Sequence, residues 1–352
     1  MLLQQALDSI GDLHKDLMDK AQARLDNLTK PIGSLGRLEE IVKQLVGITG
    51  DLNPVVDKKT VIIMCADNGV VEEGVTQTTK DVTATVTRNF TKGFTGINVL
   101  SRHANSDILI VDIGVDADLG CEGIMDCKVR RGTWNIAKGP AMTREEAIKC
   151  IETGINIVGD LKKQGINMLG TGEMGIGNTT TSSAIAIVLT DSPVEEMVGR
   201  GAGLTSEGLQ RKISVVRKAI EVNKPDKNDP IDVLAKLGGF DIAGLVGCYL
   251  GAAAYRLPIL IDGFISAAAA LIAVNIKREA KNYIFPSHGS AEPGTGAIMK
   301  ALGLQPMLNL GMRLGEGTGA ALAFHIIDAA VAAYREMGTF QDAQVEKYIP
   351  LK

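Results

Sequence analysis

Short apolar runs alternate with amphipathic stretches along most of this 352-residue chain. Four such runs are bounded by charged residues or by loops that contain Gly or Asp: residues 61–65, 107–115, 166–175 and 257–266. Continuous apolar runs of this length are typical of strands buried on both faces, as in parallel sheets. Because helical patterns follow the runs, the chain predicts βαβ crossovers and an α/β fold with a mainly parallel sheet.

The two ends of the chain have helical patterns. Residues 2–25 predict one amphipathic helix, since apolar side chains recur at spacings of three and four. These side chains are Leu3, Leu7, Ile10, Leu13 and Leu17. A Pro/Gly turn follows, and a second helix is expected to begin near Ser34 or Leu35. Residues 307–338 predict a loop and then a long Ala-rich helix.

Composition indicates a soluble, globular protein. The chain is 45% hydrophobic and 22% charged, and its net charge of −4 comes without any Lys/Arg run, so neither nucleic acid nor an anionic membrane is expected as a partner. Residues 257–276 have the length of a membrane helix. Pro258, Asp262 and Gly263 interrupt that span, which therefore predicts a buried strand, a turn and a buried helix.

The cysteines indicate a reducing compartment. They are odd in number, contain no CxxC pair and have no cluster of histidines near them, so neither a disulfide framework nor a metal site is expected. The five are Cys65, Cys121, Cys127, Cys150 and Cys248. Charges interrupt the N-terminal helical pattern throughout, unlike a signal peptide. We expect a cytoplasmic protein.

Acidic residues follow the apolar runs and indicate where a site would form. In open parallel sheets ligands bind outside the carboxyl ends of the strands, so these acids are expected to gather on one rim. They are Asp67, Asp112, Glu173, Asp262 and Glu316. Helix capping explains Asp67 and Asp112 equally well. Glu173, Asp262 and Glu316 lie among glycines and are better site candidates.

The Gly-rich segment 171–183 predicts an anion site. Gly170, Gly172 and Gly175 match a dinucleotide fingerprint, but no acid stands at the end of a following strand, and no lysine follows Gly177 as a P-loop requires. Residues 175–181 lead into a helix whose unpaired N–H groups would suit one monophosphate. Segments 198–212 and 287–296 are also Gly-rich, and together the three could enclose a ribose monophosphate. His288 is expected to be structural, since no Ser/His/Asp triad can be assembled around it.

Seven ordered motifs between about residues 28 and 335 resemble one enzyme family. They are TKPIGSLGRLE, ADNGV, GTGEMGIGNTT, VGRGAGL with EGLQRK, ILIDGFISAAAAL, SHGSAEPG and MRLGEGTGAALA. This set is similar to that of the nicotinate-nucleotide:dimethylbenzimidazole phosphoribosyltransferases of cobamide biosynthesis.

The resemblance implies a fold, a reaction and an assembly. The fold would be a large Rossmann-like domain over residues 29–324, with helices on both faces of its sheet. Residues 1–28 and about 325–352 would form a small helical domain. The enzyme would move 5-phosphoribose from nicotinate mononucleotide to an aromatic base without a metal or other cofactor. It would form a homodimer, or a heterodimer with a homologous chain.

The resemblance also implies roles for particular residues. Glu316 would be the general base, with Glu173 and Asp262 near the ribose and Lys212 facing phosphate or carboxylate. The mononucleotide and its phosphate would contact Gly175, Ile176, Gly177, Asn178, Thr179, Thr180, Gly201, Gly203, Gly289 and Ser290. The acceptor base would contact Thr76, Thr78, Lys80 and Leu314.

The segment after ADNGV departs from the family pattern. Asn68 stands where benzimidazole-using relatives usually have histidine, and residues 76–80 read TQTTK where an aromatic residue, a proline and a glutamine are expected. Lys80 could favour a developing phenolate, so phenol or p-cresol becomes an alternative to dimethylbenzimidazole, although the change could also be neutral drift. A catalytically weak, mononucleotide-binding subunit is a further alternative. A transferase that uses phosphoribosyl diphosphate would need two adjacent acids, whereas ILIDGF has one.

Overall fold

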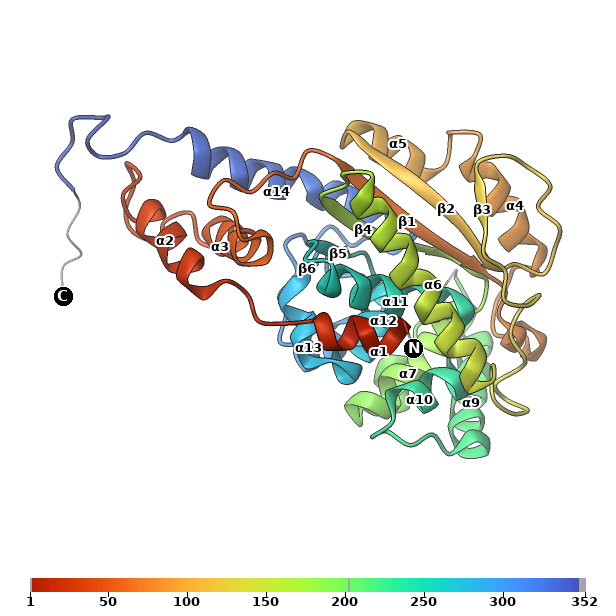
Figure 1. Cartoon of the computed structure of the whole chain (residues 1–352). Helices are drawn as coiled ribbons and strands as arrows, with labels where there is room; N and C mark the ends of the chain where they lie inside the picture. The colour runs from red at the N-terminus through yellow and green to blue at the C-terminus, as the bar shows by residue number, and fades with distance from the viewer. Residues whose placement is uncertain (1, 202, 348–352) are drawn as a thin grey trace.

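Residues 2–201 and 203–347, which the computed structural model describes, form a six-stranded sheet with helices packed around it (Figure 1). The strand order is β3-β2-β1-β4-β5-β6, and all neighbouring strands are parallel. The strands are β1 (Lys59–Ala66), β2 (Ser106–Gly114), β3 (Ile124–Asp126), β4 (Met168–Met174), β5 (Ile259–Ile261) and β6 (Ile284–Pro286). The order reverses direction between β1 and β4, which is where open parallel sheets form ligand crevices.

The predicted α/β fold with a mainly parallel sheet is confirmed. The four apolar runs overlap β1, β2, β4 and β5, and every residue of β1 is buried. Strands β3 and β6 were not predicted. Each is three residues long and pairs on one side at an edge of the sheet, so neither carries a run long enough to detect.

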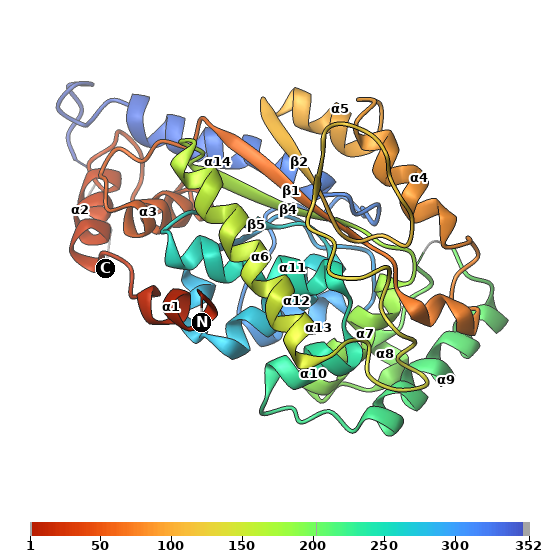
Figure 2. The same cartoon turned by 45° about the vertical axis from the view of Figure 1, so that its right-hand side comes forward.

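Helices cover both faces of the sheet (Figure 2). On one face lie α6 (Arg144–Lys163), α11 (Phe240–Ala254) and α12 (Phe264–Ile276). On the other lie α5 (Gly96–His103) and α14 (Thr318–Glu336), while α4 (Asp81–Phe90) lies near the carboxyl ends of β1 and β4. Gly170 of β4 lets Phe324 of α14 approach the sheet, because a Cβ at Gly170 would lie 3.2 Å from the ring.

Most of the remaining elements come between β4 and α14 in the sequence. The remaining elements are η1 (Gly69–Glu73), α7 (Asn178–Thr190), α8 (Val194–Met197), α9 (Ser206–Asn223), α10 (Pro230–Leu237), η2 (Arg278–Tyr283) and α13 (Thr295–Leu302). In the part of the chain that the structure describes, no helix has both the length and the apolar content to cross a membrane.

The single helix predicted for residues 2–25 is wrong. The structure has α1 (Leu2–Ser9) and α2 (Lys15–Leu25), separated by an irregular segment. Tertiary contacts explain the break: the carbonyl of Gly11 accepts a hydrogen bond from Tyr283 Oη, and that of Asp12 accepts one from Arg256. The next helix, α3 (Arg37–Thr49), begins two to three residues later than predicted.

Helices α2 and α3 pack together beside the outer half of α14 at one end of the molecule (Figures 1 and 2). Arg24 of α2 donates a hydrogen bond to the carbonyl of Tyr334, and Thr29 N donates to the carbonyl of Gly338. Helix α1, by contrast, packs on α6 and α11. The division into a small helical and a large α/β domain stays a prediction.

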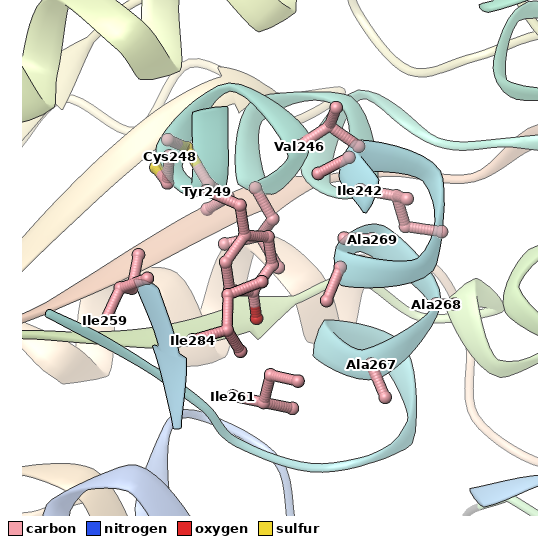
Figure 3. Close-up of a cluster of buried hydrophobic side chains, with 14 of the residues drawn as sticks. Ile242, Val246, Cys248, Tyr249, Ile259, Ile261, Ala267, Ala268, Ala269 and Ile284 are labelled. Atoms are coloured by element: carbon pink, nitrogen blue, oxygen red, sulfur yellow. The ribbon is translucent and has the colours of Figure 1, made fainter. Parts of the chain in front are cut away.

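The core between α11, α12 and the strands supports the carboxyl end of β4 (Figure 3). Tyr249 of α11 is fully buried, and its hydroxyl lies 3.0 Å from Oγ1 of Thr171 in β4. Thr171 also donates to the carbonyl of Leu260 in β5. These bonds satisfy buried polar groups two residues before Glu173, and they fix the strand that carries it.

Candidate active site

A cavity of about 260 Å³ opens at the carboxyl ends of β1, β4 and β5. Residues 75–77, 173–179, 262–266 and 313–316 line it, together with Val86 and parts of the loops after α8 and β6. This is the edge of the sheet where the sequence predicted that acids and Gly-rich loops would meet.

Most of the predicted site residues line this cavity. They are Thr76, Glu173, Gly175, Ile176, Gly177, Asn178, Thr179, Gly201, Asp262, Ser290, Leu314 and Glu316. Six others lie outside its lining: Thr78, Lys80, Thr180, Gly203, Lys212 and Gly289. The roles of all these residues stay predictions.

Glu316 projects from a tight turn in left-handed backbone. The φ angles of Gly315, Glu316 and Gly317 are 84°, 62° and 94°. For a residue other than glycine this region costs roughly 1–2 kcal/mol, so the surrounding structure must stabilise the turn. Gly172 is part of that surrounding, because a Cβ there would overlap the carbonyl oxygen of Glu316.

Asp262 holds this turn. Its Oδ2 accepts a hydrogen bond from Gly317 N at 3.0 Å, and its Oδ1 accepts one from Gly319 N at 2.7 Å. Burial raises the pKa of Asp262, whereas His288 and the backbone donors lower it. We predicted ribose contact or charge stabilisation for this residue. In the structure one of its oxygens is bonded to the turn that carries Glu316 and the other to the first turn of α14 directly after it.

The Glu316 carboxylate lies against the N-terminus of α5. Its Oε2 accepts a hydrogen bond from Ile97 N at 3.2 Å, and a capping box of Thr95 and Asn98 closes that end of the helix. Burial raises the pKa of Glu316, the Ile97 N–H lowers it in part, and the charge of Asp262 raises it. A half-buried carboxylate with a raised pKa is suited to accept a proton near neutral pH.

Glu173 shares an amide with a second acid that the sequence did not reveal. Asn178 Nδ2 donates hydrogen bonds to Glu173 Oε2 and, at 3.0 Å, to Asp241 Oδ2. Burial and the neighbouring Asp241 raise the pKa of Glu173 to about 8, and burial raises that of Asp241 to about 7. We predicted that Asn178 contacts the mononucleotide, but its side-chain amide is bonded to these two carboxyls.

The Gly-rich loop after β4 leads into α7 as predicted. Gly177, at φ 93°, precedes the helix, and Thr179 in its first turn lines the cavity. Lys212 lies behind this turn, where its Nζ donates to Thr179 Oγ1 at 2.8 Å and to the carbonyl of Gly199 at 3.1 Å. Burial lowers the pKa of Lys212 to about 8. The lysine therefore contacts the loops around the cavity and does not line it.

Four charged or titratable side chains line the cavity beyond those predicted: Arg200, His288, Glu292 and Arg313, of which the acid Glu292 is buried. Arg200 and Arg313 are exposed cations at its edge, and His288 is buried. His288 Nε2 lies 3.8 Å from Asp262 Oδ1, and its Nδ1 has no hydrogen-bond partner among residues 2–201 and 203–347. Each belongs to a Gly-rich loop already singled out, which is the sequence signal that could have identified it.

Lys80 does not reach the cavity. Its Nζ forms an ion pair with Asp116 Oδ2 at 2.8 Å, with more than half of the lysine side chain exposed. The prediction that Lys80 faces the acceptor disagrees with this position. Thr76 and Gln77 of the same loop do line the cavity, next to the apolar side chain of Val86.

Within the described residues, no group of three or more His, Cys, Asp or Glu side chains has a geometry that could hold a metal ion. The lining of the cavity combines a Gly-rich turn at a helix N-terminus, two arginines, apolar side chains and the half-buried Glu316.

Comparison with known proteins shows which proteins the chain is similar to. A phosphoribosyltransferase family model matches residues 10–345. The chain is 68% identical over 352 residues to the nicotinate-nucleotide–dimethylbenzimidazole phosphoribosyltransferase of Ruminiclostridium cellulolyticum, with both chains covered fully. Identity to the Acetivibrio thermocellus protein of the same name is 68% over 349 residues, with 99% of each chain covered. The crystal structure of CobT from Thermus thermophilus superposes with a TM-score of 0.91 at 38% identity, covering 95% of this chain and 100% of that one.

Proposed function

The chain belongs to this phosphoribosyltransferase family, and from that membership we propose that it transfers the 5-phosphoribosyl group of nicotinate mononucleotide to dimethylbenzimidazole. The products are an α-riboside 5′-phosphate and nicotinate. The observation that carries the proposal is the turn at residues 315–317, which presents one carboxylate to a cavity that is also lined by a Gly-rich turn at a helix N-terminus.

The lining of the cavity suits both substrates. The Gly175–Thr179 turn at the N-terminus of α7, with Arg200 nearby, provides donors and positive charge for a phosphate. Val75, Val86 and Leu314 provide apolar surface for an aromatic ring.

The chemistry follows from these groups. The acceptor nitrogen forms a bond to C1 of the ribose, and the C1–N bond to nicotinate breaks. The electron pair of the broken C1–N bond stays with nicotinate and neutralises its pyridinium. Glu316 takes the proton that the acceptor loses, which requires the ionised carboxylate. Positive charge builds on the ribose in the transition state, and the ionised carboxylate of Glu316 in the lining of the cavity stabilises it.

The acceptor is proposed from two observations. The relatives are named for dimethylbenzimidazole, and Lys80, which suggested a phenol, is paired with Asp116. Phenol and p-cresol remain outcomes of the test below.

A dimer is proposed on the exposed apolar side chains near the cavity. Leu310 and Leu314 are 60% and 62% exposed, and Phe94 is 61% exposed. Leu314 packs beside Gly96, two residues from Phe94. Sedimentation of the purified chain tests this, and a monomer at micromolar concentration would overturn it.

The decisive experiment uses the chain alone. Purified protein is incubated with nicotinate mononucleotide and, separately, dimethylbenzimidazole, phenol and p-cresol, and both products are quantified by mass spectrometry. We expect turnover with dimethylbenzimidazole, and a loss on the order of 10²–10⁴-fold in Glu316→Gln. Glu221→Gln, at an exposed glutamate of α9, is the matched control. Saturable mononucleotide binding without nicotinate release would overturn the proposal in favour of a binding subunit, and turnover with a phenol only would overturn the acceptor.

A further inference from the structure

The amide of Asn178 joins two carboxyl groups that come from distant parts of the chain. Its Nδ2 donates to Glu173 Oε2 at the end of β4 and to Asp241 Oδ2 at the start of α11. All three side chains are buried. Because an amide nitrogen has two protons, both are used, and the two carboxyls are held on either side of one NH₂ group.

Asp241 is separated from the cavity by backbone. It does not line the cavity, whereas Glu173 and Asn178 do. Gly175 passes directly over it, since a Cβ at Gly175 would lie 2.8 Å from Asp241 Oδ2. Gly239 is closer still to the other oxygen, because a Cβ there would overlap Asp241 Oδ1. Asp241 is therefore connected to the lining of the cavity through Asn178, which donates hydrogen bonds to both carboxyls.

The titratable groups that act on Glu173 are acids and a thiol, while Arg200 and Arg313 line the same cavity and, among the described residues, form no ion pair with Glu173. Glu173 is faced by Asp241 from α11, by Asp262 from the loop after β5 and by Glu316 from the turn before α14, and Cys65 of β1 lies within range of its charge. Among the ion pairs of the described residues, none includes Glu173 or Asp241. Two carboxyls buried this close without a cation cannot both ionise at neutral pH.

We propose that Asp241 is a positioning residue that, through Asn178, orients Glu173 toward the cavity and retains one proton on the Glu173–Asp241 pair at neutral pH. Glu173 then offers a carboxyl O–H to the substrate, while Glu316 remains the anion that accepts a proton. The identity of that substrate rests on the function proposed above, but the shared proton does not.

The shared proton can be measured without catalysis. Both carboxyls have pKa values raised by burial, so they take up protons on folding, and stability falls as the pH rises between the unfolded and folded values. Asp241→Asn removes the charge but leaves an amide oxygen for Asn178. We expect the unfolding free energy of this variant, measured in urea, to fall less steeply from pH 5 to pH 9 than that of the wild type. The difference in slope should correspond to up to one proton fewer taken up on folding. Exposed Asp107→Asn is the matched control and should leave the slope unchanged.

Glu173→Gln supplies the reciprocal test, and it keeps the proposal testable if Asp241→Asn folds poorly. It should flatten the slope as Asp241→Asn does. Ile242→Val, a substitution at the next, buried position, controls for loss of packing. Its unfolding free energy should change with pH as steeply as that of the wild type.

Catalysis gives the second measurement. In Asp241→Asn the alkaline limb of kcat/KM for nicotinate mononucleotide should move to lower pH by about 1–3 units, because Glu173 loses a neighbouring negative charge. An unchanged slope together with an unchanged limb overturns the proposal, and so does an equal loss of activity at every pH, which indicates a structural role only. A wild type that releases no nicotinate with any acceptor would refute the proposed function, and the urea slopes would still decide whether the proton is shared.

Discussion

Asp262→Asn is the substitution that tests most directly how the fold presents Glu316. In the wild type, one carboxylate accepts hydrogen bonds from Gly317 N at 3.0 Å and from Gly319 N at 2.7 Å. An asparagine has one acceptor oxygen, and its NH₂ group would face the second backbone N–H. One buried donor therefore loses its partner while the size of the side chain is preserved.

The magnitude follows from comparing two opposing terms. A hydrogen bond to a charged group contributes about 1.5–3 kcal/mol, and leaving a buried donor unpaired costs a similar amount. The left-handed conformation of Glu316 costs roughly 1–2 kcal/mol. The free energy lost with one hydrogen bond is thus comparable to the conformational strain of Glu316 that the bond offsets. If the turn loses about 2 kcal/mol of stabilisation, kcat falls roughly 30-fold, since each 1.36 kcal/mol is a factor of ten.

The assay separates kcat from KM, because both hydrogen bonds of Asp262 go to the backbone directly after Glu316, so that their loss should displace the general base. We expect the loss mainly in kcat, with a lower free energy of unfolding in urea. Asp328→Asn is the matched control: it removes the partner of Lys59 further along α14, away from the turn. An Asp262→Asn enzyme within threefold of the wild type in kcat would refute the reasoning, since the turn would then hold Glu316 without its second bond.

Three further predictions concern the same site. Lys80→Gln should leave the ranking of acceptors unchanged, because Lys80 is paired with Asp116 outside the cavity; competition assays with mixed acceptors check this, and a switch in preference would contradict it. Gly172→Ala should lower both stability and turnover, since its Cβ would overlap the carbonyl of Glu316, whereas Gly139→Ala, with no atom near its Cβ, should be neutral in thermal unfolding and nicotinate-release assays. The acidic limb of kcat should lie above the ordinary glutamate value of 4.5, because burial raises the pKa of Glu316 and only the ionised base is active; a rate that stays constant down to that pH would contradict it.

The sequence by itself determined the fold class and the edge of the sheet where the site lies. Apolar runs of strand length followed by helices specify a parallel sheet through local pattern alone. The position of each Gly-rich loop after such a run then places its side chains at the carboxyl ends of the strands. Glu173, Asp262 and Glu316 could be predicted to meet for this reason.

Only the tertiary structure decided what these side chains contact. Asn178 bonds to Asp241, 63 residues away, and Asp262 bonds to backbone 55 and 57 residues away. Lys80 turns to Asp116, 36 residues on. Periodicity and spacing describe neighbours along one element, whereas these bonds depend on how separate elements pack, and burial then sets the pKa values of the acids. The location of the site could thus be predicted from the sequence. The hydrogen-bond partners of its acids and the direction of their pKa shifts became known only from the tertiary structure.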